Sequence, residues 1–81
     1  MSDYLLNTFK QHRDIVLAVV FNPDGQSIAS ASEDGIIKLW RFDGKVIATL
    51  KGHQAGVFDL DFSPDGKTIA SASLDKTIKL W

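Results

Sequence analysis

The sequence contains no cysteine, and only two of its 81 residues are histidines. Neither a disulfide nor a Cys/His metal site is therefore available to stabilise it, although a chain of this size buries only about 60 % of its unfolded surface. A basic excess is also missing, since nine basic residues face ten acidic ones. Proteins that bind nucleic-acid phosphates normally have such an excess, so we expect no nucleic-acid partner.

Long apolar runs are absent as well, and no stretch approaches the roughly 20 residues of a membrane span. The N-terminus opens on an acid, Asp3, where a secretory leader would have basic residues. We therefore expect a cytoplasmic protein that does not engage membranes. Hydrophobic residues make up 44 % of the chain, a proportion typical of globular proteins, which argues against a disordered tail.

The sequence does contain an internal repeat, with two copies of one unit. Shifted by 41 residues, the stretch 12–40 (HRDIVLAVVFNPDGQSIASASEDGIIKLW) aligns without a gap to 53–81 (HQAGVFDLDFSPDGKTIASASLDKTIKLW), and 16 of the 29 positions are identical. Upstream, residues 4–11 align with 45–52 and share a threonine and a lysine. The chain is therefore two copies of a unit of about 41 residues.

Each copy predicts short strands separated by turns. The stretches 22–25 (NPDG) and 63–66 (SPDG) have turn chemistry, because proline presets φ and glycine accepts a positive φ. Between the turns run β-branched segments with a period of two, and no segment has helical periodicity over a useful length. The sequence therefore predicts an all-β chain with four strands per copy.

The second copy contains, in order, a Gly-His pair, SPDG, S-x-S-x-D and I-K-L-W, and the first copy contains the last two of these elements in the same order after NPDG. On these elements the chain resembles the WD-repeat β-propeller family. The first copy departs from the pattern, with Gln11 before the histidine and Arg41 after the tryptophan, where the family has Gly and Asp. The resemblance implies blades of four antiparallel strands. Carried onto this sequence, it places innermost strands at 16–21 and 57–62, second strands at 27–32 and 68–73, third strands at 36–41 and 77–81, and outer strands at 45–51 and 4–10.

The resemblance also implies a structural tetrad of hydrogen-bonded side chains in each copy. A buried indole N–H, hydroxyl and imidazole each need a partner, and a carboxylate in a tight turn can accept from the histidine. The two sets are His12, Ser30, Asp34 and Trp40, and His53, Ser71, Asp75 and Trp81. Ser32 and Ser73 lie on the same strand faces, so either serine of each pair could take the role.

Serine, histidine and aspartate are also the residues of a hydrolase triad. We expect no enzyme, because the set occurs twice at identical spacing beside a tryptophan and no G-x-S-x-G motif accompanies it. The two histidines, 41 residues apart, lack the spacing of a metal site. The glycines lack phosphate-loop spacing, so no cofactor is expected.

The resemblance places partner contacts where innermost strands begin and at the residue before each tetrad aspartate. Mapped here, this candidate face is Ile15, Leu17, Glu33, Gly56, Phe58 and Leu74. Its apolar members are either a site for a protein or peptide ligand or packing at the rim of the fold.

Two blades leave two apolar faces uncovered, and closed rings are the usual solution for repeat arrays. We therefore expect residues 1–81 to form one two-blade unit whose ring is closed by homo-oligomerisation. In this scheme 12–51 form the first blade, 52–81 form three strands of the second, and 1–11 complete the second blade of a neighbouring chain. The contact between copies then joins 4–10 to 77–81. We favour a tetramer with eight blades over rings of six or ten.

These inferences favour a non-catalytic protein–protein interaction scaffold that assembles from two-blade units. The alternative is a piece of a regulatory propeller domain that is attached to an enzyme or signalling module in a longer parent protein.

Overall fold

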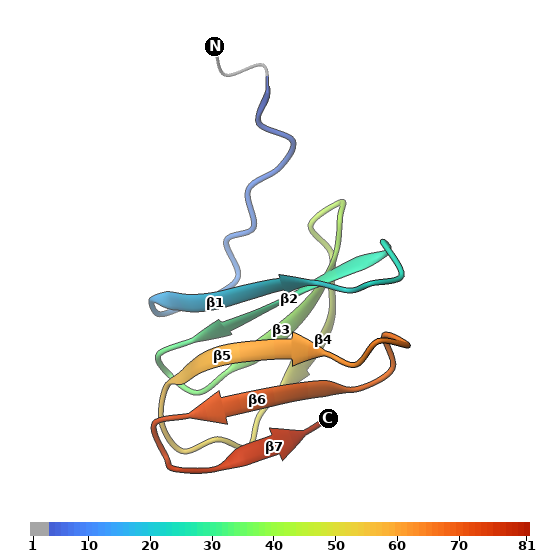
Figure 1. The fold of residues 1–81 in the computed structure, drawn as a ribbon. Helices are drawn as coiled ribbons and strands as arrows, with labels where there is room; N and C mark the ends of the chain where they lie inside the picture. The colour runs from blue at the N-terminus through green and yellow to red at the C-terminus, as the bar shows by residue number, and fades with distance from the viewer. Residues whose placement is uncertain (1–3) are drawn as a thin grey trace.

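Two antiparallel sheets make up the computed structural model, which describes residues 4–81 (Figure 1). The first sheet contains β1 (Val16–Phe21), β2 (Ser27–Ser32), β3 (Ile37–Arg41) and β4 (Val46–Leu50). The second contains β5 (Val57–Phe62), β6 (Ile69–Ser73) and β7 (Ile78–Leu80). Strand order follows chain order in both sheets, so the prediction of an all-β chain built from repeated antiparallel sheets is confirmed.

These seven strands agree with the expected positions to within one residue at either end. The exception is the segment expected to form an outer strand at 4–10, because residues 5–12 pair with no strand of their own chain. In Figure 1 this segment rises away from both sheets. Residues 1–3, the start of the segment expected to be donated to a neighbour, lie outside the described residues.

Both innermost strands contain the same irregularity, since the register shifts between Val16 and Ala18 in β1 and between Val57 and Asp59 in β5. A bulge of this kind bends the strand and places Val57 on the same face as Leu60. The repeated sequence therefore reproduces its local geometry as well as its strand order.

Each sheet has two faces, which we name by their small residues. In the first sheet the alanine face carries Ala18, Val20, Ala29, Ala31, Ile37 and Leu39, and the serine face carries Val16, Val19, Phe21, Ile28, Ser30 and Trp40. In the second sheet the alanine face carries Asp59, Asp61, Ala70, Ala72, Ile78 and Leu80, and the serine face carries Val57, Leu60, Phe62, Ile69, Ser71 and Trp81.

The hydrophobic core lies between the alanine face of the first sheet and the serine face of the second. Ala29, Ala31 and Ile37 are fully buried there against Val57 and its neighbours on β5. The small alanines leave room for the larger side chains opposite, which is how two sheets interdigitate. At one end of this contact the Asn22 side-chain amide donates to the Gly66 carbonyl at 3.2 Å.

In the part of the chain that the structure describes, no helix is long and apolar enough to cross a membrane.

Candidate functional site

A hydrogen-bonded cluster in the second copy joins the four side chains that the sequence singled out there. Trp81 Nε1 donates to Ser71 Oγ at 2.8 Å, and Ser71 Oγ lies 2.7 Å from His53 Nε2. On the other side of the ring, His53 Nδ1 lies 2.8 Å from Asp75 Oδ2. The indole N–H, the hydroxyl and the imidazole are therefore all satisfied by one chain of contacts.

The first copy makes only part of this cluster. Trp40 Nε1 donates to Ser30 Oγ at 2.7 Å, and Ser30 Oγ lies 2.5 Å from His12 Nε2. Asp34 accepts from the Ser32 hydroxyl instead, and the buried His12 Nδ1 has no hydrogen-bond partner among residues 4–81. The expected contact between His12 and Asp34 is therefore not made.

One sequence difference lies beside the histidine. A Cβ on Gly52 would lie 2.9 Å from Trp81 Cη2, so the chain runs close to the indole at this point. The corresponding residue of the first copy is Gln11, which carries a side chain where the second copy has glycine.

A second difference lies in the turn that carries the aspartate. The Thr77 hydroxyl lies 2.5 Å from Asp75 Oδ1 and 3.3 Å from His53 Nδ1, which fixes the carboxylate beside the ring. Ile36 occupies the corresponding position in the first copy and has no hydroxyl. The sequence analysis did not identify the role of Thr77, although the alignment of the two repeats places this threonine opposite Ile36.

Further bonds tie the second copy together where the chain enters β5. The Gln54 N–H donates to Asp75 Oδ2 at 3.0 Å, and the Ser73 hydroxyl donates to the Ala55 carbonyl at 3.0 Å. Ser73 thus holds the turn while Ser71 holds the indole, which separates the roles of the two serines. Ser30 and Ser32 divide in the same way, since Ser30 accepts from the indole and Ser32 donates to Asp34.

The titration of these groups follows from the contacts. The Thr77 hydroxyl, followed by the Gln54 N–H and His53, holds the pKa of Asp75 well below its ordinary value, against the opposing effect of burial. The Ser32 hydroxyl lowers the pKa of Asp34 in the same way. Burial, followed by the nearby Lys38 charge, lowers the pKa of His12.

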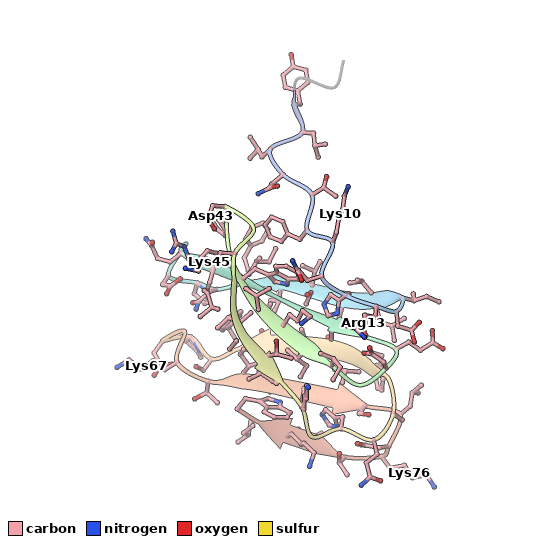
Figure 2. The ribbon with its side chains drawn as sticks, turned by 180° about the vertical axis from the view of Figure 1, so that it is seen from behind. Lys10, Arg13, Asp43, Lys45, Lys67 and Lys76 are labelled. Atoms are coloured by element: carbon pink, nitrogen blue, oxygen red, sulfur yellow. The ribbon has the colours of Figure 1, made fainter. Side chains whose placement is uncertain are left out.

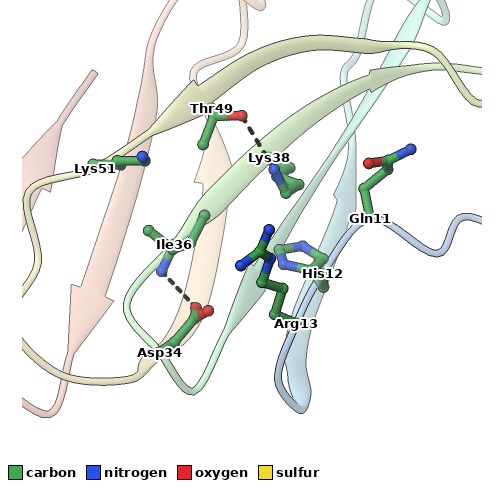
Figure 3. Close-up of a pocket in the computed structure, with 8 residues that line it drawn as sticks. All are labelled: Gln11, His12, Arg13, Asp34, Ile36, Lys38, Thr49 and Lys51. Atoms are coloured by element: carbon green, nitrogen blue, oxygen red, sulfur yellow. Dashed lines mark hydrogen bonds between the residues drawn. The ribbon is translucent and has the colours of Figure 1, made fainter.

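A pocket opens beside His12 between β3, β4 and the segment that leads into β1 (Figure 3). The Lys38 ammonium donates to Thr49 Oγ1 at 3.2 Å across its wall, and Arg13 lies beside the imidazole. Asp34 closes the pocket from the turn after β2. The pocket therefore lies between His12 and Asp34, the two tetrad residues that are not hydrogen-bonded to each other.

Four members of the candidate partner-binding face are exposed apolar residues, which we call the apolar rim: Ile15, Leu17, Phe58 and Leu74. Within each copy one backbone bond fixes this end of the sheet, since Glu33 N donates to the Ile15 carbonyl and Leu74 N donates to the Gly56 carbonyl, both at 2.9 Å. Gly56 itself is buried, and a Cβ there would lie 3.2 Å from the Glu33 carbonyl oxygen. Gly56 therefore lies beneath the exposed members of the candidate face.

Among residues 4–81, no group of three or more His, Cys, Asp or Glu side chains is arranged to hold a metal ion. Charged side chains such as Lys10, Lys45, Lys67 and Lys76 point outward from the edges of the sheets and from their turns (Figure 2).

The chain contains one antiparallel sheet of four strands and one of three, both in chain order, and each sheet carries a His–Ser–Trp cluster. Antiparallel sheets of this kind, repeated and packed face to face, are the blades of β-propellers. The family follows from the sequence comparison, in which residues 3–41 and 44–81 each match the WD40 family, described as "WD domain, G-beta repeat". The chain therefore belongs to the WD40 repeat family.

Curated proteins match single stretches of the chain. Nuclear distribution protein nudF of Aspergillus niger is 51 % identical over 37 residues, or 46 % of this chain and 8 % of that protein. The nudF protein of Aspergillus terreus is 49 % identical over 37 residues, with the same shares. Protein HIR1 of Kluyveromyces lactis is 41 % identical over 39 residues, or 48 % of this chain and 4 % of that protein. The chain thus spans less than a tenth of the length of these relatives.

Proposed function

We propose that the protein is a non-catalytic, cytoplasmic interaction scaffold whose copies assemble into a closed propeller, with four chains supplying eight blades. The observation that carries the proposal is a contrast between equivalent residues. Ile37, on the alanine face of the first sheet, is 0 % exposed, whereas its counterpart Ile78 in the second sheet is 75 % exposed. Phe62, on the serine face of the second sheet, is 8 % exposed, whereas Phe21 is 68 % exposed.

Each chain therefore leaves two faces uncovered, the serine face of its first sheet and the alanine face of its second sheet. Inside the chain, the other alanine face and the other serine face pack together. The free alanine face of one chain and the free serine face of the next can meet as the two blades of a single chain do. This contact is head-to-tail, and such contacts close into rings when the rotation per step allows it. Two blades per chain restrict the ring to an even number of blades.

The first blade supplies a register for the strand exchange. In the pairing of β3 with β4, Lys38 lies opposite Thr49 and Ile37 lies opposite Leu50. Moved along by one repeat, this register pairs Lys79 with Thr8 of the next chain and Ile78 with its Phe9. Residues 4–10 would then supply the fourth strand beside β7.

Contacts of the N-terminal segment with its own chain support this arrangement. The Phe9 and Trp40 rings lie 5.1 Å apart, where the second copy brings Leu50 and Trp81 into one cluster. The Asn7 amide donates to the Phe42 carbonyl at 3.2 Å. Residues 7–9 are therefore held over the first blade, at the side where a neighbouring chain would place its second blade.

The cluster of Ser71, His53 and Asp75 has the connectivity of a hydrolytic triad, but its environment favours a structural role. Ser71 is 1 % exposed, and its oxygen already accepts the Trp81 indole N–H. An attacking serine must reach its substrate. The apolar rim is the better candidate for function, and we propose that it binds an apolar segment of a protein or peptide.

Cysteine cross-linking tests the assembly, because the native sequence has no cysteine to interfere. In the variant Thr8→Cys/Lys79→Cys, oxidation should link chains into a covalent ladder that reaches four chains on a non-reducing denaturing gel. The matched control Thr8→Cys/Lys67→Cys places the second thiol in the β5–β6 turn and should not cross-link efficiently. Equal cross-linking of both variants would contradict the register.

Native mass tests the ring itself. Light scattering should give a mass near four times the 8.9 kDa of the chain. Removal of residues 1–10 should abolish this assembly, because the second blade then lacks its fourth strand. An unchanged mass after removal would contradict the shared blade.

An alternative proposal is that the chain is part of a regulatory propeller domain in a longer protein. The short span of the matches favours it, since the chain covers only 8 % of the nudF protein. The same free faces would then pack against further blades of one polypeptide. A monomer at all accessible concentrations would favour this alternative over the ring.

A further inference from the structure

Two kinds of blade contact alternate around the proposed ring, one within each chain and one between chains. Both use an alanine face against a serine face, but the residues at equivalent positions differ. The following inference rests on the proposed ring and concerns the strength of the contact between copies.

The first difference is a pair of carboxylates. Inside the chain, the alanine face of the first sheet presents Ala18 and Val20 to the core. The register places Asp59 and Asp61 at these positions in the second sheet, opposite Ala72 and Ala70. Both aspartates are exposed in the single chain. A second copy would cover them with the apolar serine face of its first blade, which carries Val16, Val19 and Phe21.

Lys38 also lies on this serine face, opposite Ser30, where its ammonium donates to Thr49 Oγ1 at 3.2 Å. The β1 residues of the face, which would lie nearest the carboxylates, are apolar and offer no cation. Burial of a charged group without a partner opposes association, because the lost hydration is not replaced. At the contact within the chain the equivalent residues are Ala18 and Val20, which are apolar and pack against apolar residues, so they do not oppose the packing of the two sheets.

The second difference is steric. Gly35 has a φ of +86°, and a Cβ there would lie 2.8 Å from the His53 carbonyl oxygen and 3.0 Å from that of Ala55. The equivalent residue of the second copy is Lys76, which has a φ of +73° and does carry a Cβ. At the contact between copies, this Cβ would face the carbonyls of His12 and Asp14 of the neighbouring chain.

We infer that the contact between copies is much weaker than the contact within each chain, and that Asp59, Asp61 and Lys76 are the residues that weaken it. The ring therefore opens at these contacts while the two blades of each chain stay packed, so assembly is reversible and depends on concentration. The occupant of the free alanine face is a second copy, because the chain itself supplies the complementary serine face.

The test measures the dissociation constant by analytical ultracentrifugation for variants that restore the internal contact. Asp59→Ala/Asp61→Val should lower the dissociation constant by about tenfold or more at pH 7. Lys76→Gly should lower it independently. The control Asp24→Asn/Asp43→Asn removes two carboxylate charges from exposed turns away from the alanine face and should leave the constant unchanged.

The outcomes separate this inference from the proposed ring. Tighter association of the restored variants with an unchanged control supports both. A discrete tetramer whose dissociation constant is the same in all variants, or larger in Asp59→Ala/Asp61→Val, overturns the inference and leaves the ring intact. A larger dissociation constant in Asp59→Ala/Asp61→Val would indicate that the carboxylates meet a basic surface. Failure of every variant to associate at any concentration overturns the ring and the inference with it.

Discussion

His53 Nδ1 lies 2.8 Å from Asp75 Oδ2, whereas the equivalent atom of His12 has no hydrogen-bond partner. The two repeats are identical at the histidine and at the aspartate, so the difference arises from their neighbours. A buried donor that stays unsatisfied forfeits a hydrogen bond, and this makes the first cluster the weaker of the two.

Asp75→Asn should therefore lower the urea midpoint of unfolding clearly more than Asp34→Asn does. Asp75 links His53, Gln54 and Thr77, whereas Asp34 bonds within its own turn. Chemical denaturation followed by tryptophan fluorescence measures both variants. Equal losses would show that the two aspartates have equivalent roles in solution.

The open first cluster should close if its neighbours are converted to those of the second. Gln11→Gly lets the chain pass over Trp40, and Ile36→Thr supplies the hydroxyl that holds the carboxylate. We expect the double variant to gain about 0.5–1.5 kcal/mol of unfolding free energy, the usual range for a hydrogen bond. The reverse changes, Gly52→Gln and Thr77→Ile, are the matched control and should destabilise the protein.

An NMR measurement checks the mechanism of that gain. In the double variant a proton on His12 Nδ1 should become protected from exchange to the same degree as one on His53 Nδ1. A gain in stability without this protection would show that the new bond is not its source.

The fold was predictable from the sequence because the 41-residue repeat, the NPDG and SPDG turns and the period-2 strands all indicate the same blades. The open first cluster was not predictable by the same means. It depends on contacts between residues far apart in the sequence, such as the close approach of Gly52 to Trp81 in the second copy. The burial of Gly56 depends on a contact of the same kind, because a Cβ there would lie 3.2 Å from the carbonyl oxygen of Glu33, in the turn after β2.

Stability should fall as the pH drops below about 4, the ordinary pKa of an aspartate. The pKa of Asp75 is lower in the folded chain than in the unfolded chain, chiefly because of the Thr77 hydroxyl. The unfolded chain therefore binds the proton first as the pH falls, and the stabilisation present at neutral pH is lost. Thr77→Val should remove part of this effect.

Urea titrations between pH 7 and pH 2 measure the Thr77→Val effect. The difference between native protein and variant should be largest at neutral pH and should narrow in acid. Thr49→Val, which removes only the exposed contact with Lys38, is the control and should give a difference that does not depend on pH. A constant difference for Thr77→Val would contradict the role of its hydroxyl.

Ser71→Ala should destabilise the protein by about 1–3 kcal/mol, because the Trp81 indole and the His53 ring both lose their partner. Ser71→Thr keeps the hydroxyl and should retain more of the stability. Assays with activated esters provide the functional control. Hydrolysis by the native protein that disappears in Ser71→Ala would contradict the non-catalytic proposal.

Trp40 stabilises the protein both through the packing of its ring and through a hydrogen bond, and two variants can separate these contributions. Its ring is 1 % exposed and packs against Phe9, while its N–H donates to Ser30 at 2.7 Å. Trp40→Ala should cost about 3–5 kcal/mol, because a large buried ring and its hydrogen bond are both lost. Trp40→Phe keeps much of the apolar volume, so its cost should be smaller and should reflect mainly the unpaired Ser30.

Since Phe9 lies in the segment proposed to cross between chains, Trp40→Ala should also weaken association, and light scattering at concentrations where the variant remains folded measures that loss. A folded Trp40→Ala variant with native assembly would show that the ring contact of Phe9 does not help to position the exchanged strand.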